Sequence, residues 1–120
     1  ITQFIARLKK RKPPIIYGDG QQTRDFVHVK DIIEANMLAL NCQHEFGEAI
    51  NVGTGKPTTI NQLAAVLLEL SGRSDLKPKY ATPRKGDIRN SCADISKAKR
   101  VLGYEPKIIL KKGLRTLLSM

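Results

Sequence analysis

The chain has 120 residues, and a chain of that length buries enough surface for one modest core and not for two. Hydrophobic residues make up 41% of the sequence and charged residues 27%, which is typical of a globular protein and argues against disorder. No apolar run approaches the roughly 20 residues that cross a bilayer, so we expect no membrane partner. The N-terminus also lacks the pattern of a signal peptide.

The net charge of +10 is unevenly distributed along the chain. Residues 1–12 carry basic side chains and no acid, residues 13–72 are acidic overall, and residues 73–120 are strongly basic. Such a balance raises the question of a small basic nucleic-acid-binding module. Against it stand the small number of aromatic residues (three Tyr, three Phe, no Trp) and the lack of a recognised nucleic-acid-binding motif. We therefore expect no nucleic-acid partner and interpret the basic blocks as solvated faces or as a site for a phosphorylated ligand.

Two cysteines, Cys42 and Cys92, lie far apart and outside any CxxC pattern. Without an export signal they predict reduced thiols and a cytoplasmic protein. His44 lies close enough to Cys42 to share a metal ion, but nothing completes a set of four ligands, so we expect no metal site.

The first half of the chain predicts two helices and short extended segments. Apolar residues at helical spacing predict a helix over 1–11, which ends before Pro13-Pro14. A β-rich run predicts a strand over 15–17, and an extended segment is expected over 25–29. Asp31 is expected to cap a helix that runs to Asn41.

The apolar face of this second helix is wide, so we expect the helix to be well buried. The face consists of Ile32, Ile33, Ala35, Met37, Leu38 and Leu40. Glu34, three residues after Asp31, is expected to complete a capping box. A strand is then predicted over 49–52, before the turn at Gly53.

The second half predicts three helices and one strand. Thr59 and Gln62 form the pattern of a capping box for a helix over 58–71, and Gly72 supplies a left-handed stop. An edge strand over 77–81 follows, and Asp94 is expected to cap a short helix that ends at Gly103. A last helix carries a leucine stripe, which consists of Leu110, Leu114, Leu117 and Leu118. Helices that alternate with short strands predict an α/β or α+β fold.

No complete catalytic set is present in the sequence. The turns Gly18-x-Gly20 and Gly53-x-Gly55 lack the third glycine of a dinucleotide-binding loop. None of the three tyrosines is followed by lysine four positions later, and the GxSxG motif of serine hydrolases is missing. We therefore assign no catalytic and no cofactor-binding residue to this chain.

Two loop arginines are candidates for holding a diphosphate. Arg24 follows the turn at 18–20, and Arg84 precedes Gly86 and Asp87. A guanidinium group gives a phosphate two parallel charge-assisted hydrogen bonds, and a carboxylate accepts hydrogen bonds from the vicinal hydroxyls of ribose. Each motif alone is weak, because a loop arginine is more often solvated or paired with a neighbour, which for Arg24 is Asp25.

Four motifs in this order resemble the C-terminal part of the NAD-dependent epimerase/dehydratase family, the extended short-chain dehydrogenases that act on nucleotide sugars. They are IYGDGQQTRDFVHVKD (16–31), NVGTGKPT (51–58), RKGDIR (84–89) and ADISKAKRVLGYEP (93–106). The likeness is greatest to the UDP-glucose 4-epimerase branch. The dehydratase and decarboxylase branches share the Tyr-Gly-Asp-Gly turn and remain alternatives. Lys111 and Lys112 depart from the family, whose last helix usually opens with acidic residues.

The resemblance implies an α/β fragment that is the substrate-binding region of such an enzyme. Its Rossmann domain, which would hold NAD and the catalytic Tyr and Lys, is absent from this sequence. In agreement, Ile1 already lies in an apolar stripe without a capping residue before it, so we expect upstream chain to be missing. The parent reaction would oxidise the sugar of a UDP-sugar at C4 by hydride transfer to NAD and return the hydride to the other face.

By the same analogy, Arg24 and Arg84 would hold the diphosphate and Asp87 the ribose hydroxyls. The main chain of Ile16 and Tyr17 would lie along the uracil, with the Tyr17 ring shielding it. Residues 29–56 would pack on the Rossmann domain. Without that domain we expect a bare apolar patch or a homo-oligomer; the residues concerned are Ile32, Ile33, Leu38 and Val52.

Overall fold

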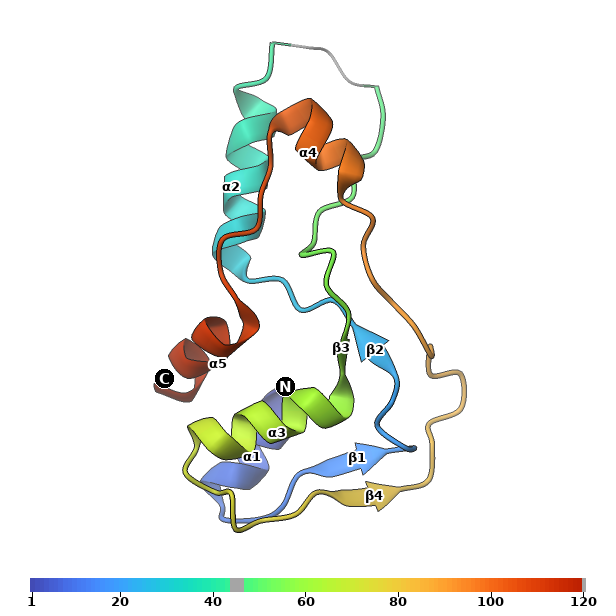
Figure 1. The fold of residues 1–120 in the computed structure, drawn as a ribbon, viewed down its shortest axis with the longest axis vertical. Coiled ribbons are helices and arrows are strands. Elements are labelled where there is room, and N and C mark those ends of the chain that lie inside the picture. Colours follow the sequence, from blue (N-terminus) through green and yellow to red (C-terminus); the bar gives the residue numbers. More distant parts are fainter. Residues whose placement is uncertain (44–46, 120) are drawn as a thin grey trace.

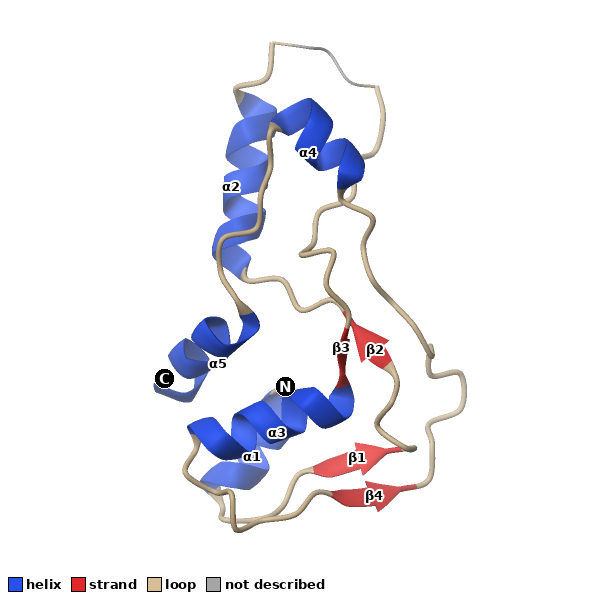
Figure 2. Ribbon diagram, in the orientation of Figure 1, coloured by secondary structure: helices blue, strands red, loops and turns tan. Residues whose placement is uncertain are grey.

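The computed structural model describes residues 1–43 and 47–119. Within them the chain forms helices and two small sheets in an elongated shape of 52 × 32 × 16 Å (Figure 1, Figure 2). None of the described helices is long and apolar enough to cross a membrane. The elements are α1 (Thr2–Lys9), β1 (Ile15–Tyr17), β2 (Thr23–Arg24), α2 (Val29–Leu40), β3 (Thr58–Thr59), α3 (Ile60–Leu70), β4 (Lys79–Ala81), α4 (Ser96–Leu102) and α5 (Leu110–Ser119).

Each sheet joins segments that are distant in the sequence. β1 pairs in parallel with β4, with Ile16 opposite Tyr80, and β2 pairs antiparallel with β3. On its other side Thr23 of β2 binds the loop after β4, because its N–H donates to the Arg89 carbonyl at 2.9 Å. The loop that carries Arg84 and Asp87 is thereby held beside Arg24.

Two hydrophobic clusters stabilise the two ends of the molecule. The first joins α1, β1, α3 and α5, and its buried residues are Phe4, Leu8, Ile16, Leu63, Ala64, Leu67, Leu68 and Leu114. The second joins α2, α4 and the segment after α4, and its buried residues are Ala35, Ile95, Ala98, Leu102 and Tyr104. Figure 1 shows α2 and α4 at one end of the long axis, with β1 and β4 at the other.

Most of the predicted elements are confirmed, with ends that differ by a few residues. The capping box of α3 is present: Thr59 accepts from the Gln62 N–H, and the Gln62 side chain accepts from the Thr59 N–H. Gly72 and Gly103 follow α3 and α4 with φ of +64° and +65°, as expected for left-handed stops. The mixed helix and strand fold is confirmed as well.

The predicted start of α2 is wrong. The helix begins at Val29, and the side chain of His28 accepts a hydrogen bond from the Lys30 N–H at 3.1 Å. Asp31 lies inside the first turn and is buried; its carboxylate accepts hydrogen bonds from the N–H groups of Lys107 and Ile108, both at 3.1 Å. The capping-box interpretation was wrong because the Asp31 carboxylate accepts hydrogen bonds from a distant segment and not from the first turn of its own helix.

The strand predicted over 49–52 is not formed, and the segment expected to be extended over 25–29 ends one residue earlier, because α2 begins at Val29. A strand requires a partner for its backbone groups, and the strands of the described chain pair in the two sheets above. Ile50 and Val52 instead pack against the second hydrophobic cluster. A short β-rich run before a glycine turn was therefore not sufficient to predict a strand.

The prediction that α2 is well buried is also wrong. Only Asp31 and Ala35 of this helix are buried, whereas Val29, Ile33, Met37 and Leu40 are 64%, 54%, 52% and 78% exposed. Ile33 is thus bare, as the resemblance implied. Leu38 and Val52, which were also expected to be bare, are partly covered by the second cluster.

Candidate functional site

The five residues predicted to bind substrate line one pocket between α1, β1 and the loop after β4. The cavity has a volume of about 160 Å³. We call it the two-arginine pocket; its walls include Ile16, Tyr17, Gln22, Arg24, Arg84 and Asp87. A neighbouring hollow of about 260 Å³ shares Tyr17, Gln22, Arg84 and Asp87 and extends to Asp19 and Arg89. The two arginine side chains therefore face a common space.

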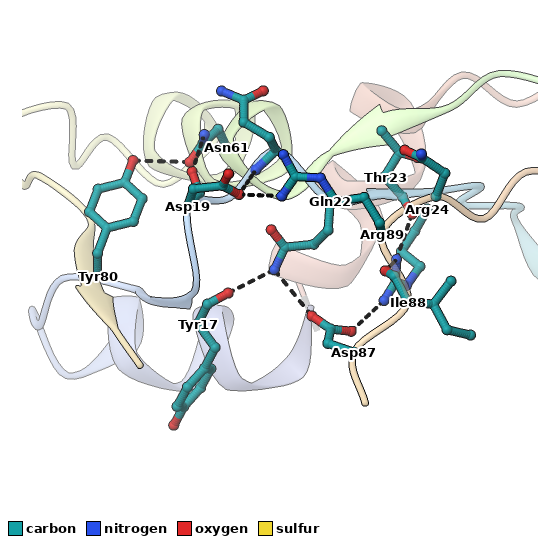
Figure 3. Close-up of polar contacts among 12 residues, drawn as sticks. Tyr17, Asp19, Gln22, Thr23, Arg24, Asn61, Tyr80, Asp87, Ile88 and Arg89 are labelled. Carbon is teal, nitrogen blue, oxygen red and sulfur yellow. Dashed lines mark hydrogen bonds and ion pairs between the residues drawn. The ribbon is translucent and has the colours of Figure 1, made fainter. Parts of the chain in front are cut away.

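Arg24 is held by the loop after β4 rather than by its neighbour in the sequence. Its Nη2 lies 2.6 Å from Oδ1 of Asp87, and its Nη1 donates to the carbonyls of Thr23 and Ile88, each at 2.6 Å (Figure 3). The alternative pairing with Asp25 is not observed. These contacts orient the guanidinium and place it directly beside the predicted ribose-binding carboxylate.

Arg84 lines the pocket through contacts with β1 and α1. Its guanidinium carbon lies 4.2 Å from the centre of the Tyr17 ring, which is a cation–π contact. Its Nη2 is 3.5 Å from the side-chain oxygen of Gln3. Arg84 is exposed, so its guanidinium group is accessible to an anion.

Gln22 is a pocket residue that the sequence analysis did not assign to the site. Its amide nitrogen donates to the Tyr17 carbonyl at 2.7 Å and to Oδ2 of Asp87 at 3.3 Å (Figure 3). The residue is only 8% exposed. Burial and a two-way hydrogen bond are properties of the folded chain, so a glutamine in a polar turn motif carried no indication of them.

The turn at 18–20 is fixed by several polar contacts. Asn61 donates from its side chain to the Asp19 carbonyl and from its backbone to the Gly20 carbonyl, both at 3.0 Å. The Tyr80 hydroxyl donates to Oδ1 of Asn61 at 3.0 Å. Arg89 pairs with Asp19 at 2.7 Å, and this hydrogen bond lowers the pKa of the Asp19 carboxyl. The turn is therefore a rigid edge of the site.

Asp25, which follows β2, joins this part of the chain to the segments at 54–55 and at 93. Its carboxylate accepts hydrogen bonds from the N–H groups of Thr54 (3.0 Å), Gly55 (2.9 Å) and Ala93 (3.3 Å), and from the Thr54 hydroxyl. Burial raises the pKa of Asp25, but the hydrogen bonds from Thr54, Gly55 and Ala93 outweigh it, so the pKa lies below its ordinary value. Asp25 therefore has a structural role, away from the two-arginine pocket.

Neither glycine turn provides a cradle for NAD. The turn at 18–20 follows β1 but leads into β2, and the turn at 53–55 leads through the short antiparallel β3 into α3. A dinucleotide loop instead joins a parallel strand directly to a helix N-terminus. Among the described residues no group of three metal-binding side chains is present, and His44 lies outside them.

Comparison with known proteins identifies the family. The family model for GDP-mannose 4,6 dehydratase matches residues 1–117. The chain belongs to this family. The resemblance to NAD-dependent epimerases and dehydratases, the extended short-chain dehydrogenases, is thereby confirmed.

Relatives in this family carry out several reactions on nucleotide sugars. A putative UDP-glucose 4-epimerase of Methanocaldococcus jannaschii is 41% identical over 120 residues, which are 99% of this chain and 37% of the relative. UDP-glucuronic acid decarboxylase 4 of Arabidopsis thaliana is 33% identical over 95% of this chain and 25% of its own length. A dTDP-glucose 4,6-dehydratase from an Actinoplanes strain is 34% identical over 95% of this chain and 35% of its own length.

Solved structures show the same fold. The UDP-glucose 4-epimerase of Thermotoga maritima with UDP-glucose is 43% identical and has a TM-score of 0.88 over 97% of this chain. The UDP-glucuronic acid 4-epimerase of Bacillus cereus, in complex with UDP-glucuronic acid and NAD, is 33% identical and has a TM-score of 0.89 over 98%. The chain spans 37% of the length of each of these two proteins.

Proposed function

We propose that this chain forms the part of an NAD-dependent nucleotide-sugar epimerase that holds the nucleotide of a UDP-sugar. The supporting observation is the two-arginine pocket, in which two guanidinium groups, a carboxylate and a tyrosine ring from three segments converge on one cavity. Arginine is well suited to phosphate, because its planar fork donates two parallel hydrogen bonds and stays charged.

The contacts in the pocket suggest which residue would bind each part of the nucleotide. Arg24 and Arg84 would neutralise the diphosphate, and Arg84 would leave the face of Tyr17 as the uracil approaches. Asp87 already accepts from Arg24 and Gln22. A carboxylate has about four acceptor positions, so two remain for the ribose hydroxyls without loss of these contacts.

The proposed parent reaction is the interconversion of UDP-glucose and UDP-galactose at C4. The epimerases among the relatives and solved structures support this branch. The decarboxylase and dehydratase relatives support the alternative of another reaction within the same family. Since the glycine turns do not fit NAD, the cofactor and the catalytic residues would come from a domain outside this chain.

The exposed face of α2 is the proposed contact with that NAD-binding domain. Val29, Ile33, Met37 and Leu40 follow one another at intervals of a helical turn and form a single apolar stripe. Burial of this stripe would remove an exposed patch of the kind that marks interaction surfaces. If Met37→Cys in the full-length protein reacted with maleimide as fast as the exposed Cys92, this packing would be contradicted.

Calorimetry with UDP tests the pocket. We expect the full-length protein to bind UDP, and Arg24→Ala and Arg84→Ala each to weaken binding by about tenfold or more, since hydrogen bonds to charged groups contribute about 1.5–3 kcal/mol. Arg100→Ala is the matched control: it removes the same charge from the exposed surface of α4, at the far end of the molecule (Figure 1). Equal UDP affinity in both pocket variants and the control would refute the proposal.

A further inference from the structure

We propose that Gln22 is a positioning residue that sets the orientation of the Asp87 carboxylate and the Tyr17 carbonyl for recognition of ribose and base. This inference rests on the proposed function and adds to it a residue outside the predicted site. It concerns the geometry of the pocket and not the chemistry at the sugar.

The position of Gln22 gives its amide nitrogen two acceptors from separate segments. Tyr17 ends β1, and Asp87 lies in the loop after β4; the amide nitrogen is 2.7 Å from the Tyr17 carbonyl oxygen and 3.3 Å from Oδ2 of Asp87. An NH₂ group has two donors, so both contacts can be satisfied at once. One side chain thereby couples the edge expected to face the base with the carboxylate expected to face the ribose.

The orientation of this amide is determined by its surroundings. If the amide were reversed, its oxygen would face a carbonyl oxygen and a carboxylate, and neither can donate a hydrogen bond. In the observed orientation the side-chain oxygen of Gln22 is buried and has no hydrogen-bond partner among the described residues. The observed orientation is therefore the one in which the nitrogen can donate to both acceptors.

Gln22 and Arg24 together hold Asp87 from two sides. Arg24 binds Oδ1 at 2.6 Å and Gln22 binds Oδ2, so neither oxygen can turn about the last side-chain torsion without losing a contact (Figure 3). Two vicinal hydroxyls can donate one hydrogen bond to each carboxylate oxygen only when the plane of the carboxylate is turned toward them. Without the Gln22 contact, only the ion pair with Arg24 would restrain this torsion, so the Asp87 carboxylate would turn more easily.

The decisive measurement is discrimination between UDP and 2′,3′-dideoxy-UDP, which lacks the ribose hydroxyls. For the wild-type full-length protein we expect UDP to bind more tightly than the dideoxy analogue. In Gln22→Met, which has a similar shape and no donor, we expect the ratio of the two affinities to fall by about tenfold, in line with loss of a hydrogen bond to a charged group. Inorganic pyrophosphate, which has neither ribose nor base, is expected to bind both proteins equally.

Gln22→Glu tests the same role with a nearly identical shape. At pH 7 a second carboxylate would face Asp87 at about the present distance, and UDP affinity is expected to fall. As the pH is lowered, this glutamate takes up a proton and regains one donor. The UDP affinity of the variant is therefore expected to rise toward the wild-type value, whereas the wild type is not expected to show such a rise. The control is Gln21→Met, which changes the adjacent and exposed glutamine.

The outcomes separate this inference from the proposed function. If the wild type binds UDP, the arginine variants weaken it and Gln22→Met keeps the wild-type ratio, the role of Gln22 is refuted and the pocket stands. The same holds if Gln22→Glu binds UDP like the wild type at every pH. If UDP does not bind the wild type, both proposals are refuted.

Discussion

Asp25→Asn provides a direct test of how the middle of the molecule is held together. Asp25 links β2 to two other segments, because its carboxylate accepts from the backbone of Thr54, Gly55 and Ala93. The close approach depends on Gly53: a Cβ added there would lie 2.6 Å from an oxygen of Asp25 and 2.7 Å from the Cβ of Ala93. Asparagine has the same shape but replaces one of the two acceptor oxygens by a donor.

The expected loss is about 2 kcal/mol of unfolding free energy. A hydrogen bond to a charged group contributes about 1.5–3 kcal/mol, and the variant loses the charge and places an NH₂ group against backbone donors. The loss is smaller than the sum over all contacts, since Gly55 is exposed and water can replace its bond. For a chain of this size about 2 kcal/mol corresponds to a fall in Tm of roughly 8 °C.

The difference in unfolding free energy between the wild type and Asp25→Asn is expected to depend on pH. The pKa of Asp25 is lowered in the folded protein, so its contribution to stability is complete above the ordinary value of 3.8 and is lost as the pH falls through the folded value. Asparagine does not titrate, and the other carboxylates are common to both proteins. We therefore expect urea unfolding to show a gap between wild type and Asp25→Asn at pH 7 that shrinks toward pH 3. Asp75→Asn, in the exposed loop after α3, is the control. A gap that stays constant or widens in acid would refute the role assigned to Asp25.

Two further substitutions test buried and close-packed contacts. In Tyr104→Phe, loss of the buried hydroxyl that donates to the Gly53 carbonyl at 2.8 Å is expected to lower the unfolding free energy by about 1–2 kcal/mol, measured by urea denaturation; an unchanged midpoint would contradict this. In Gly20→Ala, the new Cβ would lie 2.0 Å from Oδ1 of Asn61 at a φ of +73°, so we expect a lower Tm and weaker UDP binding. A variant with the Tm and UDP affinity of the wild type would show that the turn is not rigid.

The sequence predicted the helices well where their signals were local. The Thr59 and Gln62 capping box, and the left-handed stops at Gly72 and Gly103, depend on a few neighbouring residues, and all are present. The errors concern segments whose structure depends on distant partners. Asp31 is of a residue type that often caps helices, but its carboxylate binds the backbone N–H groups of residues 107 and 108. No local pattern reveals that contact.

The candidate site was accessible from the sequence through the order of its motifs and not through any single residue. Arg24 and Arg84 are separated by much of the chain, and the structure brings them to one cavity because Thr23 bonds the loop that follows β4. Gln22 lay inside the quoted motif, yet its role required the positions of the Tyr17 carbonyl and Asp87. The positions of these groups relative to Gln22 follow from the pairing of the strands. Local sequence patterns do not reveal which strands pair.

The α2 stripe shows why an apolar helix pattern is ambiguous about its partner. The pattern of Ile33, Met37 and Leu40 indicates a face that avoids water, and it reads identically whether the cover is the chain's own core or another domain. Here the chain's own second cluster takes Ala35 and leaves these three side chains exposed. Within the described residues these three side chains are exposed, so only a surface outside them can bury this stripe. The proposed NAD-binding domain would provide that surface, and the same contact would fix the two-arginine pocket relative to the nicotinamide.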